Sequence, residues 1–246
     1  MKWYDKNIVP REEEKKLFIL VSVAIAPSLA LLSYFYLRRE IESEPTRLLF
    51  YSFIYGAILT FPILFIQYIV QQETALTDNS FWSGSLSAML EEFFKWLILL
   101  VAIYRQTKFS DPYDGILYGA SVALGFATVE NILFLVSFGI DNAFIRALLP
   151  VSSHALFGVV MGYYLGRAQF VKKGEKLQLT LALFAPLLLH FVYNSILYTA
   201  DDEVMVWSVF MLGLWIFALS RVKQAHILSR KYRLMQHPFY DSNKPS

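Results

Sequence analysis

Long apolar stretches alternate with short polar segments along the whole chain. Seven stretches each approach the ~20 residues that an α-helix needs to cross a bilayer. They cover residues 17–37, 48–70, 85–104, 115–138, 147–166, 177–199 and 204–220. The connecting segments are too short to hold a second globular domain. The pattern therefore predicts an all-α polytopic membrane bundle of about seven transmembrane helices, forming one domain over residues 1–220.

The composition supports this class of fold. Hydrophobic residues make up 56% of the 246 residues and charged residues only 17%, whereas a soluble domain carries about a quarter charged residues. The chain has no cysteine, which excludes disulfides and thiolate chemistry. Basic residues are confined to loops and tails beside the apolar stretches, apart from Lys95, so we expect contact with the lipid bilayer and no nucleic-acid partner.

Basic residues also predict the orientation of the chain. Most of the 22 lysines and arginines fall in alternate connecting segments and after residue 220, and such segments are usually cytoplasmic. We therefore expect a multi-pass protein of the cell membrane with its N-terminus outside. Residues 221–246 form a basic, cytoplasmic C-terminal tail in this interpretation, and its first part is typical of segments that contact anionic lipids.

One apolar stretch contains three charged residues: Glu91, Glu92 and Lys95. A charged side chain at membrane depth costs about 2.5–3.5 kcal/mol on insertion scales. On an α-helix Lys95 follows the two glutamates by four and three residues, so all three side chains can share a face. They could form an intramembrane salt bridge that only joins helices, or they could leave a carboxylate available for chemistry.

Ionisable residues of four different stretches fall at a similar depth. With a rise of ~1.5 Å per residue, the paired glutamates and His154 lie ~10 Å below the predicted outer surface, Glu130 ~12 Å and His190 ~13 Å. Asn194 follows His190 by one helical turn. Because unrelated polar residues would not converge in this way, we expect one polar site within the outer leaflet.

Small residues share faces with these polar groups. Gly119 and Ala123 precede Glu130 at spacings typical of one helix face, and His154 begins a line of glycines at residues 158, 162 and 166. Small residues four apart let transmembrane backbones approach closely. We therefore expect these two helices to pack tightly and to point their polar groups into the bundle.

The residue types leave three kinds of chemistry open. A buried carboxylate with histidine can activate water, while a histidine and an amide stabilise an oxyanion. Two histidines with carboxylates can instead hold a divalent metal such as zinc; the ligands would be His154, His190, Glu130 and Glu92. Buried carboxylates and histidines are also typical of proton- or ion-coupled transporters.

The order of these motifs resembles one family. Glu91-Glu92-x-x-Lys95, Phe126-x-x-x-Glu130, an isolated His154 and His190-x-x-x-Asn194, on successive stretches, are similar to motifs of the PrsW family of intramembrane proteases. That family is grouped with CAAX-type prenyl endopeptidases and bacterial Abi proteins. The resemblance covers roughly residues 48 to 200. Glu130 stands where the CAAX-type relatives carry histidine, and the resulting carboxylates and histidines are also a donor set for a metal.

The resemblance implies a function and a set of roles. PrsW-like proteins make the first cut in membrane-anchored anti-sigma factors during stress signalling, on the extracytoplasmic side. It implies a glutamate of the pair, Glu91 or Glu92, as general base, with His190 and Asn194 at the oxyanion. We add the hypothesis that Glu130 orients the base or shares its proton and that His154 polarises the water. Lys95 would support the site by balancing charge. Besides an enzyme or a transporter, the third alternative is a non-catalytic scaffold similar to APH-1-like subunits.

Overall fold

The computed structural model of the chain describes residues 12–40, 46–73, 80–107, 109–171, 173–199 and 204–236. The charged N-terminal tail up to residue 11 and the last ten residues of the basic C-terminal tail lie outside these ranges. Within them the protein consists of helices, as the hydropathy pattern predicts.

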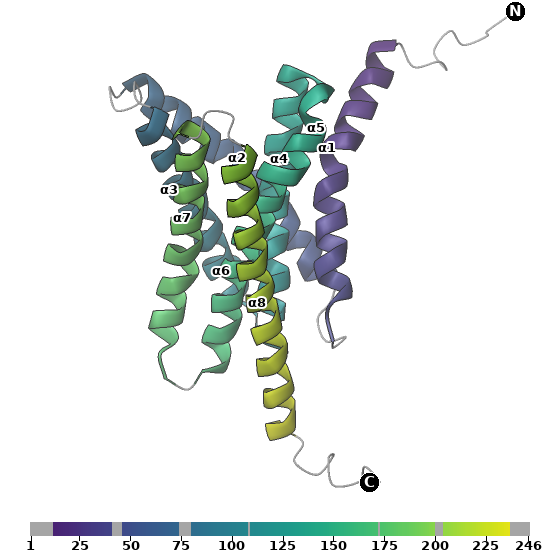
Figure 1. The fold of residues 1–246 in the computed structure, drawn as a ribbon. Helices are drawn as coiled ribbons and strands as arrows, with labels where there is room; N and C mark the ends of the chain where they lie inside the picture. The colour runs from purple at the N-terminus through teal and green to yellow at the C-terminus, as the bar shows by residue number, and fades with distance from the viewer. Residues whose placement is uncertain are drawn as a thin grey trace, which may run out of the picture.

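Long helices run up and down through the bundle in chain order (Figure 1). Their bounds are α1 Glu12–Leu37, α2 Thr46–Glu73, α3 Ser80–Ile98, α4 Asp114–Phe138, α6 Ser152–Phe170, α7 Glu175–Thr199 and α8 Val204–Gln236. A π-helix, η2 (Leu99–Tyr104), continues α3. Between α4 and α6 lie three short segments: η3 (Ile140–Asn142), α5 (Ala143–Arg146) and the π-helix η4 (Ala147–Val151).

The membrane-spanning helices agree with the predicted stretches, with one difference in α3. Among the described residues, six helices are long and apolar enough to cross a membrane. One of the six is continuous over α5, η4 and α6. The helix α3 is absent from these six because Glu91, Glu92 and Lys95 interrupt its apolar sequence. It also begins at Ser80, earlier than the predicted residue 85.

The helix α4 is the centre of the bundle. It packs against α1, α2 and α6, and most of its residues are buried. Its close approach to α6 depends on glycines: a Cβ atom placed on Gly119 would meet the carbonyl oxygen of Gly158, and one on Gly162 would meet that of Gly115. The tight packing predicted from the small-residue spacing is confirmed, and it holds α4 against the turns of α6 that follow His154.

The helix α8 continues well past the predicted end of its apolar stretch at residue 220. It is helical up to Gln236, so the first part of the predicted basic tail is an extension of the last helix. Its final turns lie at the end of the bundle opposite to the start of α1 (Figure 1).

Candidate active site

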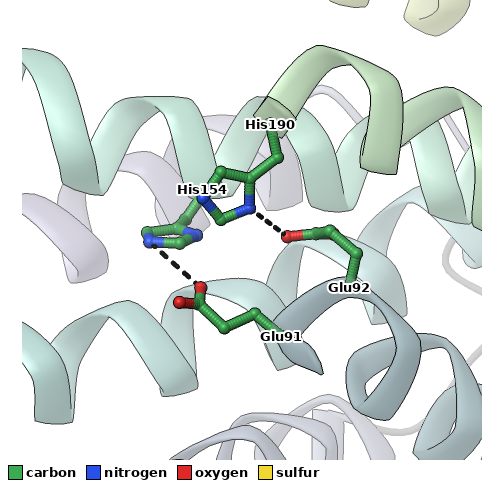
Figure 2. A group of neighbouring side chains, drawn as sticks. All are labelled: Glu91, Glu92, His154 and His190. Atoms are coloured by element: carbon green, nitrogen blue, oxygen red, sulfur yellow. Dashed lines mark hydrogen bonds and ion pairs between the residues drawn. The ribbon is translucent and has the colours of Figure 1, made fainter. Parts of the chain in front are cut away.

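Four buried side chains from three helices meet inside the bundle. Glu91 and Glu92 come from α3, His154 from the first turn of α6, and His190 from α7. One oxygen or nitrogen atom of each lies within 4.8 Å of those of the others. Figure 2 shows the two histidine rings facing the two carboxylates across the space between the helices. The convergence expected from helix depth is therefore found for these four residues.

A lysine lies among them. The Lys95 ammonium nitrogen is 2.9 Å from Oε1 of Glu92, 3.5 Å from Oε2 of Glu91 and 3.1 Å from Nδ1 of His154. Its side chain is 2% exposed, and the ring of Phe126 lies 4.3 Å from the ammonium. A cation in this position compensates the two carboxylates that α3 brings into the apolar interior.

Glu130 joins the group through His154. Its Oε2 lies 3.1 Å from Nε2 of His154. An ammonium only donates hydrogen bonds, so Nδ1 of His154 accepts from Lys95 and the ring proton lies on Nε2, where it is donated to Glu130. The Glu130 side chain is 32% exposed, more than the other members, and it therefore lies at the border of the buried site.

His190 is held by Glu92. Its Nδ1 lies 3.0 Å from Oε1 of Glu92, and its ring stacks on Phe157 with centroids 5.0 Å apart. The two histidine rings stand perpendicular at 5.3 Å. Phe157 was not predicted as a site residue. It follows His154 by three residues on the same helix face, which is the spacing that could have indicated it.

Irregular helix geometry adjoins the site. The π-helix η4 ends at Val151, three residues before His154, and η2 begins at Leu99, four residues after Lys95. Single turns of π-helix occur frequently at functional sites because they shift the register of side chains. Both π-helical segments therefore lie within about one turn of site residues, and hydropathy alone does not indicate them.

Glu91 connects the site to one end of the bundle. Its Oε1 accepts from Ser87 at 3.0 Å and from Gln67 of α2 at 3.3 Å, and Gln67 also donates to Ser87 at 2.7 Å. Two turns of α3 before Glu91, Ser83 accepts from Gln71. We call these four residues, Gln67, Gln71, Ser83 and Ser87, the α2–α3 polar ladder. Sequence reasoning missed it, although Ser83, Ser87, Glu91 and Lys95 recur every four residues.

Asn194 is directed elsewhere. Its amide nitrogen donates to the backbone carbonyl of Gly84 at 2.8 Å, which is two turns of α3 before Glu91. This hydrogen bond joins α7 to the start of α3. Of the other predicted site residues, Glu130 and Lys95 contact the four-residue cluster, whereas the amide of Asn194 is bonded to the start of α3.

The donor set fits a divalent metal. Imidazole and carboxylate groups are the ligands of catalytic zinc sites, and the buried Oε2 of Glu92 has no hydrogen-bond partner in the described structure. Glu91, Glu92, His154 and His190 would hold the ion, so Glu91 takes the place expected for Glu130. A bound metal would supply a polarised water, and it would compete with Lys95 for the same side chains.

Comparison with known proteins identifies the family. A model of the family described as "PrsW family intramembrane metalloprotease" matches residues 44–220. The chain is 47% identical to Protease PrsW of Bacillus subtilis over 221 residues, which are 89% of this chain and all of that protein. It is 46% identical to Protease PrsW of Geobacillus kaustophilus over 209 residues (85% and 93%) and 48% identical to that of Oceanobacillus iheyensis over 207 residues (84% and 96%). No solved structure matches the chain.

These matches decide between the classes that the residue types left open. The relatives are proteases and align over most of their own length. The comparison therefore favours an enzyme over a transporter or a non-catalytic scaffold. Its substrate is a protein in the membrane. The chain belongs to the PrsW family and is a multi-pass intramembrane protease.

Proposed function

We propose that the protein hydrolyses a peptide bond of a membrane-anchored protein near the extracytoplasmic face, as in the first cleavage of an anti-sigma factor. The observation that carries this proposal is the meeting of Glu91, Glu92, His154 and His190 inside the bundle. Peptide hydrolysis needs a base for water and a donor for the oxyanion, and this group contains both kinds of side chain.

Glu91 is the stronger candidate for the base. The polar ladder reaches its Oε1, which gives water a hydrogen-bonding route into the apolar bundle. Its Oε2 lies 4.0 Å from Nε2 of His154, so the two groups border the same space (Figure 2). Glu92 is completely buried and holds both Lys95 and His190, a role that favours positioning over proton transfer to bulk water.

His190 is the candidate for the oxyanion. Its Nδ1 is bonded to Glu92, so Nε2 is the ring nitrogen left for the substrate, and in a ring that carries both protons it would donate to the oxyanion. Asn194 would support the site at a distance, because its amide holds the start of α3. Glu130 orients His154 through the proton on Nε2.

The charge distribution supports the proposed orientation of the chain, with its N-terminus outside. The end of the bundle that contains the last turn of α1 and the final turns of α8 carries Arg38, Arg39, Arg230 and Arg233. Basic ends are retained in the cytoplasm. The α2–α3 polar ladder, which leads from the opposite end, would then open to the extracytoplasmic side together with the proposed site of cleavage.

The test is a comparison of membrane-protein N-termini by mass spectrometry. Cells would express the wild type or the Glu91→Gln/Glu92→Gln double variant at equal levels. New termini of single-pass proteins, present only with the wild type and mapping to the outer part of their membrane span, are expected. Termini on the cytoplasmic side would contradict the position of cleavage, and an absence of new termini would contradict the substrate class.

An anti-sigma-factor substrate can be tested in the same cells. A reporter controlled by an extracytoplasmic-stress sigma factor should rise with the wild type and stay at its basal level with the double variant. The exposed Glu73 at the end of α2 provides a matched control, since Glu73→Gln makes the same chemical change outside the site. If termini appear but no such reporter responds, the protease proposal stands and the anti-sigma-factor proposal fails.

A further inference from the structure

A cavity of about 420 Å³ lies between the end of α1 and the middle of α8, away from the active site. Its walls combine charged and apolar side chains. The lining residues are Arg38, Glu40, Leu219, Val222, Lys223, His226, Ile227 and Arg230. We call it the α1–α8 pocket. All but Leu219 lie outside residues 44–220, the part of the chain that the family model covers.

Positive charge exceeds negative charge in this pocket. Arg38, Lys223 and Arg230 face a single carboxylate, that of Glu40. Glu40 is already paired: Arg230 donates to both of its oxygens at 2.7 and 3.1 Å, and Arg233 donates to Oε2 at 3.2 Å. The charges of Arg38 and Lys223 are thus left without a carboxylate in the pocket, and they attract an anion.

The Arg38 guanidinium is oriented along its own helix. Its Nη1 donates to the Tyr34 hydroxyl at 2.7 Å, and its central carbon lies 5.1 Å from the centre of the Tyr34 ring. A guanidinium held in this way keeps its remaining N–H groups for a ligand with several acceptor oxygens, such as a phosphate. On the other side, the His226 ring stacks on Tyr113 with centroids 4.6 Å apart.

The rest of the wall is apolar. Leu219, Val222 and Ile227 lie on α8 beside the charged residues, and the Ile227 side chain is largely exposed. A ligand that satisfies both parts carries a phosphate joined to a hydrocarbon chain. A helix end that served only to set the membrane topology would need the basic residues alone. It would not need a pocket between two helices with one apolar wall.

We propose that the α1–α8 pocket binds an anionic phospholipid, with its phosphate between Arg38 and Lys223 and an acyl chain along the apolar side of α8. The pocket lies at the basic end of the bundle, where anionic headgroups gather. A lipid in this position would join the ends of α1 and α8, which are otherwise linked there through Glu40.

Lipid retention by the full-length protein tests the proposal. The purified protein would be placed in nanodiscs of phosphatidylcholine with increasing phosphatidylglycerol, and bound lipids would be counted by native mass spectrometry after release. Each basic side chain near a membrane surface contributes about 1 kcal/mol, so Arg38→Gln and Lys223→Gln should each weaken retention of phosphatidylglycerol about fivefold. Lys223→Arg should retain it, and phosphatidylcholine retention should not change.

Lys176→Gln is the matched control, because it removes one exposed charge outside the pocket at the start of α7. Equal retention by the wild type, Arg38→Gln and Lys223→Gln would overturn the proposal, as would an equal loss in Lys176→Gln. Inorganic phosphate, added alone, should not displace the lipid at millimolar concentration. Displacement by phosphate would show that the pocket recognises the free anion and not the lipid.

Discussion

The ammonium nitrogen of Lys95 lies 3.1 Å from Nδ1 of His154, which joins α3 to α6 at the candidate active site. The same ammonium contacts the carboxylates of Glu91 and Glu92. Because ammonium groups only donate, this contact also fixes the tautomer of His154 and directs its proton to Glu130. Lys95 therefore balances charge and orients the histidine at the same time.

Replacement of Lys95 by methionine should destabilise the folded protein by about 3–5 kcal/mol, the usual cost of leaving buried partners uncompensated. Two carboxylates would remain in the bundle without their cation, and His154 would lose the donor at Nδ1. Chemical unfolding in detergent micelles, followed by circular dichroism, measures the change.

Two further variants make this prediction specific. Lys16→Met removes an exposed lysine whose partner is also exposed, so it should leave stability nearly unchanged. Lys95→Met combined with Glu92→Gln should be more stable than Lys95→Met alone, because one unpaired charge is also removed. Equal stability of Lys95→Met and Lys16→Met would show that the buried cation does not hold the helices together.

The paired glutamates should both be required for cleavage. Glu91→Gln keeps the shape of the side chain and removes its basicity, and it should lower the cleavage rate about 10²–10⁴-fold, the usual contribution of a general base. Glu92→Gln should lower the rate as well, since Glu92 positions Lys95 and His190. The measurement is the rate of product formation from a purified single-pass substrate, with Glu73→Gln retaining the wild-type rate. Cleavage at the wild-type rate in both single variants would contradict the requirement for each glutamate and the assignment of Glu91 as the base.

Much of the fold follows from the sequence because the bilayer imposes a strong constraint. A helix that crosses a membrane must be apolar over about 20 residues, so the long helices appear directly as hydropathy maxima. Residues 80–84 and 221–236 extend their helices beyond these maxima, since polar residues outside the hydrocarbon region remain helical without adding hydrophobicity. The π-helical turns carry no such signal.

The site was less completely predictable. Ionisable residues at membrane depth are costly, so Glu91, Glu92, His154 and His190 could be singled out by type alone. Gln67 and Ser87 are less costly in a membrane, and their part in the site depends on how α2 and α3 are rotated, which depth does not specify. The bond of Asn194 to Gly84 likewise depends on the relative rotation of α7 and α3.

The packing of α4 on α6 should be sensitive to a single methyl group. Gly162→Ala would place a Cβ against the backbone carbonyl of Gly115, which cannot move as a side chain can, and overpacking of this kind costs about 1–3 kcal/mol. Gly213→Ala in α8 meets no atom within 4 Å and should be neutral or stabilising by up to about 1 kcal/mol. Unfolding of the two variants under the same conditions compares them. Equal loss of stability would contradict close backbone packing.

Glu40, whose carboxylate links the end of α1 to α8, should make the thermal stability of the protein depend on pH. Hydrogen bonds from Arg230, with further attraction from His226 and Arg233, lower the pKa of Glu40 below its ordinary value of 4.5. Its contribution is therefore present above that value and is lost as the pH falls through the lowered pKa. The difference in Tm between the wild type and Glu40→Gln should be small, because the Arg230 and Arg233 side chains that pair with Glu40 are exposed, and should disappear in acid. A difference that grows in acid would contradict the pairing.

Substitutions in the polar ladder should affect the delivery of water to Glu91 without changing the glutamates themselves. Gln67→Leu and Ser87→Ala remove partners of Glu91 Oε1 while every ionisable residue of the site stays in place. Cleavage should slow in both variants, and the rate in Gln67→Leu should fall further because leucine also closes the polar route between α2 and α3. Gln71→Leu, farther from the site, should slow cleavage less, since Gln71 donates to Ser83 two turns of α3 before Glu91. Rates measured with one purified substrate at equal protein stability rank the three variants. If all three cleave at the wild-type rate, water reaches Glu91 by another route, and the more exposed side of the site at Glu130 becomes the place to introduce the next substitution.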